Sequence, residues 1–216
     1  MSYVKGDKKL SFRSYNIVLG IGIMLSLICN ILMYQLISNI YPNLNTVGQV
    51  LLWIALYMIV FIIILFSNSF NNNLVIKLIS FFLFIGSVGG LTSFYFVTSA
   101  LTIINIVNVW TTILVMVIII LLFEIIQKQL LTSMNATIIA FMIVFFICEI
   151  ISSKFDIFTT SKWDYVLVFW ATYWIKNNWQ NILKNTDYTL LNAIKYIYPM
   201  YYCTVSLFVC ESPTKR

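Results

Sequence analysis

Long apolar runs, separated by short polar stretches, are the feature that most limits how this 216-residue chain can fold. A helix crosses a bilayer with about 20 predominantly apolar residues. Here 61% of the residues are hydrophobic and only 9% are charged, whereas soluble domains have about 25% charged residues. No polar segment is long enough to fold separately. We therefore predict one all-α, polytopic membrane domain over residues 15–209, with short tails at 1–14 and 210–216.

Seven apolar runs are the predicted transmembrane spans. In chain order they cover residues 15–37, 47–66, 74–97, 100–123, 134–151, 163–175 and 187–209. The third and fourth runs almost touch, and roughly 40 apolar residues cannot form one straight helix in a bilayer. We therefore predict a turn at Thr98 and Ser99 and a bend at Gly89 and Gly90. The sixth run is short, but the polar stretch after it keeps helical spacing, so we expect its helix to continue into the interface.

Basic residues indicate the orientation, because short cytoplasmic loops have an excess of Lys and Arg. The densest cluster, which contains Lys5, Lys8, Lys9 and Arg13, precedes the first run. We therefore expect a cytoplasmic N-terminal tail and a retained first span. With seven spans, the C-terminus is then expected outside. The net charge of +6 fits this topology, so we expect no nucleic-acid partner.

The last run, DYTLLNAIKYIYPMYYCTVSLFV, combines apolar residues with polar and helix-kinking ones. Lys195 lies about 12 Å into this helix, and Pro199 lacks a backbone donor. Because such a helix is ill suited to facing lipid on all sides, we predict that it is a centre about which the other spans pack. The residues predicted to form a pocket near Lys195 are Tyr196, Tyr198, Tyr201 and, from the fourth span, Asn108.

Ionisable residues within the apolar runs are the candidate functional groups, because a charge in a bilayer costs about 2.5–3.5 kcal/mol on insertion scales. Two interpretations of Lys195 stay open. Its long side chain reaches the interface, or it is buried and paired with Glu149 near the end of the fifth span. Glu149 could equally be solvated at the interface. Lys77 and Glu124 lie near span ends, and we interpret both as reaching the interface.

The residue types that are missing limit the chemistry. The sequence has no histidine, which removes the commonest general base and zinc ligand. It also has no phosphate-binding loop, no metal-ligand spacing and no pair of catalytic carboxylates. The four cysteines lie in or beside apolar runs without a CxxC pair, as is typical of small buried side chains. We therefore expect no enzymatic activity, catalytic residue, metal site or cofactor.

Four stretches have the order and the residue pattern of the spans of one known family. They are FRSYNIVLGIGIMLSLICN at the first span, FNNNLVIKLISFFLFIGSVGGLTSFYF at the third, VWTTILVMVIIILLFEIIQKQ at the fourth, and VFWATYWIKNNWQNILKNTDYTLLNAIKYIY across the last two. In these stretches the chain resembles the Bax inhibitor-1 (transmembrane Bax inhibitor motif) family, especially its divergent bacterial members. The resemblance covers most of the chain, through pattern rather than an invariant motif. It implies a bacterial cell membrane, seven helices with the last one central, and calcium leak or ion homeostasis.

The gate of that family is not carried over. The resemblance would place its two aspartates near Tyr173 and Trp174 and near Tyr198 and Pro199, and its basic residue in the second span. None of these positions is acidic, and the second span has no basic residue. The expectation is therefore a calcium-leak or ion-homeostasis protein, or a regulatory member without the aspartate gate.

Two other functions stay open. One is a small transporter or substrate-binding membrane subunit, whose pocket around Lys195 takes an anionic or aromatic solute. The other is an accessory protein of a larger membrane complex. The expected partners are thus the lipid bilayer, calcium or a small solute, and another membrane protein.

Overall fold

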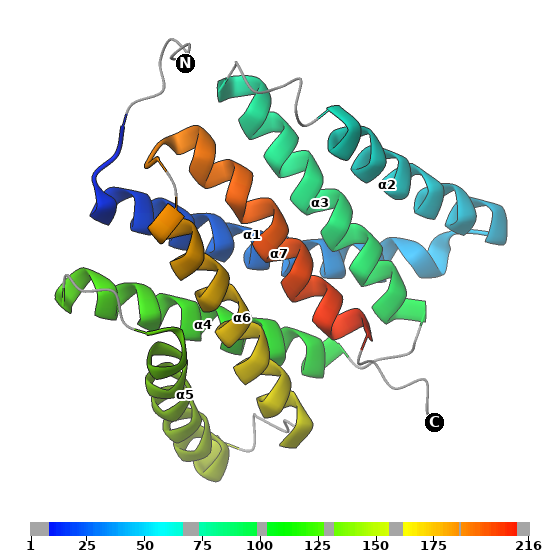
Figure 1. Cartoon of the computed structure of the whole chain (residues 1–216). Helices are drawn as coiled ribbons and strands as arrows, with labels where there is room; N and C mark the ends of the chain where they lie inside the picture. Colours follow the sequence, from blue (N-terminus) through cyan, green and yellow to red (C-terminus); the bar gives the residue numbers. More distant parts are fainter. Residues whose placement is uncertain are drawn as a thin grey trace.

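The computed structural model describes residues 9–66, 74–98, 103–127, 132–155, 162–185 and 187–210, nearly all of them helical (Figure 1). The long helices are α1 (Phe12–Ile40), α2 (Thr46–Phe66), α3 (Leu74–Thr98), α4 (Ile103–Gln127), α5 (Ser133–Phe155), α6 (Lys162–Asn185) and α7 (Leu190–Cys210), and a 3₁₀ turn, η1 (Tyr41–Asn43), follows α1. The all-α prediction is confirmed. Each predicted apolar run overlaps one of these helices.

Local sequence signals set several helix ends. The hydroxyl of Ser11 caps α1 by accepting a hydrogen bond from the backbone N–H of Ser14 at 3.1 Å. Pro42 lies in the 3₁₀ turn where α1 ends, because proline cannot continue the hydrogen-bond pattern of a helix. Near the predicted turn, α3 ends at Thr98 and α4 begins at Ile103.

Four of the described helices are long and apolar enough to cross a membrane. The qualifying segments are Phe12–Asn43, Thr46–Ile63, Leu74–Thr98 and Ile106–Ile126. A shorter apolar segment, Met134–Ile147, lies in α5. The chain is therefore compatible with a multi-pass membrane protein, and four of the seven predicted spans meet this criterion within the described residues.

The central helix of the bundle is α1, not α7. Helix α1 packs against α3, α4, α6 and α7, whereas α2 lies on α3, and α5 lies on α4 and α6 (Figure 1). The main neighbours of α7 are α1, α3 and α6, so the prediction of a final helix about which the other spans pack is wrong. The physical reason is that α7 has two faces. Ile194, Ile197 and Tyr201 are buried on one, while Lys195 and Tyr202 are exposed on the other.

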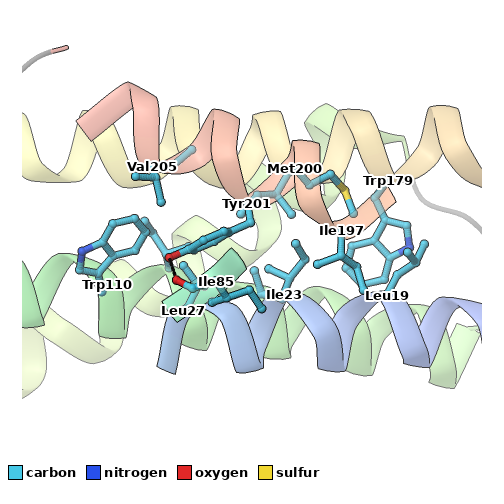
Figure 2. Packing of buried hydrophobic residues seen from close by; sticks show 14 of the residues in the cluster. Leu19, Ile23, Leu27, Ile85, Trp110, Trp179, Ile197, Met200, Tyr201 and Val205 are labelled. Atoms are coloured by element: carbon cyan, nitrogen blue, oxygen red, sulfur yellow. Dashed lines mark hydrogen bonds between the residues drawn. The ribbon is translucent and has the colours of Figure 1, made fainter. Parts of the chain in front are cut away.

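Glycines allow this close packing around α1. A Cβ added to Gly22 would overlap the Cδ1 atom of Ile197 on α7, and one added to Gly89 would lie 3.3 Å from the Cα atom of Asn30. Helix α3 runs continuously through Gly89 and Gly90. These two glycines therefore let neighbouring helices approach. The shared apolar core that results is shown in part in Figure 2.

Apolar side chains also cover much of the outside of the bundle. Among the large exposed ones are Trp53 and Phe61 on α2, Phe82 on α3, and Met142 and Phe146 on α5. Monomeric soluble proteins rarely expose contiguous apolar surface on such a scale. Acyl chains can cover it without cost, which agrees with several helices that are suited to a membrane.

Consecutive helices reverse direction. In Figure 1 the starts of α1, α3, α5 and α7 and the ends of α2, α4 and α6 face the upper left, and the opposite ends face the lower right. The predicted alternation of short connections between two sides of the bundle agrees with this arrangement. It also brings the start of α1, the end of α4 and the second half of α6 to one side.

Candidate functional site

Three polar side chains from three helices meet inside the bundle. Lys176 of α6 forms an ion pair with Glu124 of α4, and the side-chain amide of Asn16 on α1 donates a hydrogen bond to the second carboxylate oxygen of Glu124. The side chains of the ion pair are each only 1% exposed, and Asn16 is 4% exposed. The Nζ atom of Lys176 also lies 5.1 Å from the centre of the Trp179 ring. We call Asn16, Glu124, Lys176 and Trp179 the buried polar cluster.

The apolar packing one helical turn away brings this cluster together. Gly20 follows Asn16 by four residues on α1, and a Cβ added there would lie 2.9 Å from Leu121 and 3.0 Å from the ring of Trp179. Leu121 is three residues before Glu124 on α4, and Trp179 is three residues after Lys176 on α6. Each of them therefore lies on the same helix face as the charged residue of its own helix. The missing side chain of Gly20 therefore lets α4 and α6 approach α1 closely enough for their charges to pair.

The two charges compensate each other in a place where either one alone would be destabilising. Removing an isolated ion from water costs several kcal/mol even after relaxation, and the Trp179 ring adds a favourable surface for the ammonium. Some hydrogen-bonding capacity is still unused. The Asn16 carbonyl oxygen and the Trp179 indole N–H have no hydrogen-bond partner among the described residues. The cluster can therefore hold a charge or a proton and has polar atoms left for a further group.

Sequence analysis missed this cluster. Glu124 and Lys77 were predicted to reach the interface, yet they are only 5% and 6% exposed. Lys176 begins the polar stretch that follows the sixth run and was expected to continue into the interface, yet its side chain is fully buried. The signal that could have found it is a stripe on one face of α6, where Thr172, Lys176 and Trp179 follow each other at helical spacing and are all buried.

Of the two interpretations of Lys195, exposure at the interface agrees with the described residues, and burial does not. The side chain of Lys195 is exposed, and its Nζ atom lies 6.0 Å from the centre of the Tyr196 ring. The side chain of Glu149, its predicted partner, lies outside the described residues, and the helix that contains it packs on α4 and α6. Lys195 is exposed because it shares the outer face of α7 with Pro199 and Tyr202.

The predicted pocket residues point to different places. Tyr201 is buried between α1 and α3. It accepts a hydrogen bond from Asn30 at 2.9 Å. It also donates one to the carbonyl of Ile85 at 3.5 Å (Figure 2). The ring of Tyr198 packs edge-on against Phe84 of α3, with 4.9 Å between ring centres.

The other two predicted pocket residues, Tyr196 and Asn108, lie on two different helices. Tyr196 lines a cleft between α6 and α7. Asn108 lies on α4, and its buried amide nitrogen has no hydrogen-bond partner in the described part of the chain. The structure therefore does not gather the predicted residues into one pocket around Lys195.

Comparisons with known proteins return nothing. No family model, no curated protein and no solved structure matches the chain. The described residues contain no group of three His, Cys, Asp or Glu side chains that could hold a metal ion. The buried polar cluster is therefore the strongest candidate site, on its geometry alone.

Proposed function

We propose that this chain is a multi-pass membrane protein of ion homeostasis, similar to the Bax inhibitor-1 family, in which the Glu124–Lys176 ion pair controls cation passage. The observation that carries the proposal is a fully buried ion pair between two helices, held by an amide from a third. Ionisable residues inside membrane helices commonly mark ion or proton pathways. Stability alone does not explain the pair, because an apolar pair of similar volume is often at least as stable.

The pair fits a closed state. One ammonium neutralises one carboxylate, so Lys176 occupies the place that a metal cation would take beside Glu124. When Lys176 moves away, the carboxylate and the unpaired carbonyl oxygen of Asn16 become oxygen ligands, the kind that calcium prefers. Calcium takes six to eight such ligands, so backbone carbonyls and water must supply the others. The ion pair thus offers a gate to a chain that lacks the family's aspartates.

The test is calcium flux into liposomes that contain the purified protein and an enclosed calcium indicator. We expect a slow leak for the wild-type protein. Lys176→Met should increase it several-fold, because Glu124 then has no tethered cation. Glu124→Gln should reduce the leak, because the charged ligand of the buried polar cluster is gone. Lys184→Met is the matched control, because that lysine lies on the same helix but is exposed.

Two results would overturn the proposal. One is a wild-type flux no greater than that of empty liposomes, with no increase in Lys176→Met. The other is an equal increase in Lys176→Met and Lys184→Met, which would assign the leak to the general loss of a positive charge on α6 and not to the gate.

A further inference from the structure

A cleft between α6 and α7 has no role in the proposed gate. Its volume is about 320 Å³, and its lining residues are Asn178, Asn181, Ile182, Asn185, Tyr196, Pro199, Met200 and Cys203. The helices run in opposite directions (Figure 1). The end near Asn185 and Tyr196 therefore lies toward the connection between α6 and α7, and the end near Asn178 and Cys203 lies deeper along both helices. The cleft is on a different face of α6 from Lys176 and Trp179.

One wall of the cleft is a row of carboxamides. Asn178, Asn181 and Asn185 follow each other at spacings of three and four residues, which places them on one face of α6. The side-chain amide nitrogen of Asn178 already donates a hydrogen bond to the backbone carbonyl of Trp174 at 2.9 Å, so its side-chain oxygen is the atom left to act as an acceptor. Asn181 and Asn185 are exposed. This wall offers both donors and acceptors to a polar group.

The other wall is apolar, with one polar interruption. Pro199 has no backbone N–H, so the carbonyl of Lys195, four residues earlier, lacks its usual helical hydrogen bond. Tyr196, Met200 and Cys203 provide the remaining surface, and Ile182 faces them from α6. This apolar wall suits a hydrocarbon chain, because a surface without a partner loses dispersion contacts.

Positive charge borders the mouth of the cleft. Lys195 shares a helix face with Pro199, and Lys184 is adjacent to Asn185; both lysines are exposed. The exposed Asp187 lies in the connection between the helices, so the described residues from 184 to 196 include two lysines and one aspartate. An anionic group is therefore favoured at the end of the cleft near Asn185 and Tyr196.

We propose that this α6–α7 cleft binds one anionic phospholipid. The phosphate lies between Lys195 and Asn185, and one acyl chain extends along Ile182, Met200 and Cys203. Basic pockets between membrane helices are known to select anionic head groups. The lipid, rather than a soluble phosphate, is the proposed occupant because most of the lining residues are apolar and the bundle as a whole exposes many apolar side chains.

The experiment is a lipid titration of the detergent-purified, full-length protein, read by native mass spectrometry. The probes are phosphatidylglycerol, phosphatidylcholine and soluble glycerol 3-phosphate. We expect phosphatidylglycerol to bind about tenfold more tightly than phosphatidylcholine, and Lys195→Ala to reduce that preference about fivefold, the effect of one lysine near an anionic head group. Cys203→Phe should weaken the binding of both lipids, because the phenylalanine ring fills the apolar part of the cleft.

Matched variants separate this site from general effects. Arg13→Ala removes an exposed charge on α1, and Tyr202→Phe changes an exposed ring on the outer face of α7; neither should alter binding. Circular dichroism confirms that each variant is folded. Equal affinity for both lipids, unchanged by Cys203→Phe, would overturn the proposal, as would glycerol 3-phosphate competing as well as the lipid. Neither result affects the gate, which lies on another face of α6.

Discussion

Breaking the buried ion pair on one side should destabilise the protein far more than removing both charges. In Lys176→Met, methionine keeps most of the side-chain volume, so the main change is an uncompensated carboxylate in a position that is 1% exposed. Loss of one partner of a buried pair typically costs about 3–5 kcal/mol. The hydrogen bond from Asn16 stays in place, so we expect about 3–4 kcal/mol.

Glu124→Gln should be milder. The glutamine can still accept from Asn16, and the Trp179 ring, 5.1 Å from the ammonium, retains part of the stabilisation of Lys176. A desolvated contact of this kind is worth about 2 kcal/mol, so we expect a net cost of about 2–3 kcal/mol. The double variant has no charge in the buried polar cluster and should lie within about 1 kcal/mol of the wild type. The two changes should therefore be strongly non-additive, with a coupling of about 4 kcal/mol or more.

The measurement is equilibrium unfolding in mixed micelles with increasing sodium dodecyl sulfate, followed by helical circular dichroism. Lys184→Met serves as the control, because an exposed substitution should change the free energy of unfolding by less than about 0.5 kcal/mol. Single variants that each cost under about 1 kcal/mol, with an additive double variant, would show that the pair is solvated. The described geometry of the cluster would then be refuted.

Two further predictions concern the packing of α1. Gly22→Ala should lower the free energy of unfolding by about 1–3 kcal/mol, because the added methyl group overlaps the buried Ile197. Gly86→Ala should instead raise the free energy of unfolding by up to about 1 kcal/mol, because the added methyl group meets nothing within 4 Å. Unfolding of both variants in mixed micelles compares them, and equal effects would contradict the close approach of Gly22 to Ile197. Tyr201→Phe should cost about 1–3 kcal/mol because the fully buried amide of Asn30 loses its acceptor. Faster amide hydrogen exchange in α1 would report that loss, and unchanged exchange and stability would place the hydroxyl outside the core.

The helices themselves could be predicted from the sequence because their causes are local. Runs of apolar residues of bilayer length, Ser11 as a cap, Pro42 at a break and the polar stretches between runs all act over a few residues. The continuation of α6 through KNNWQNILKN was likewise visible in its spacing. Composition, too, indicated a membrane protein before any contact was known.

Whether an individual charged residue is buried depends on contacts with distant parts of the chain, and for these residues the sequence was misleading. Distance along the chain placed Lys195 deep and Glu124 near an edge, yet burial depends on which face meets a neighbour. Glu124 and Lys176 are 52 positions apart, and their pairing depends on Gly20 of a third helix.

The choice of central helix depends on the same tertiary packing. A glycine-bearing surface on α1 packs closely against several neighbours, whereas α7, with an exposed lysine and proline, can pack on one side only. The sequence by itself determined an apolar, all-helical chain suited to a membrane. Only the tertiary structure decided which charges lie inside, because a charge is buried when its partner arrives from another helix.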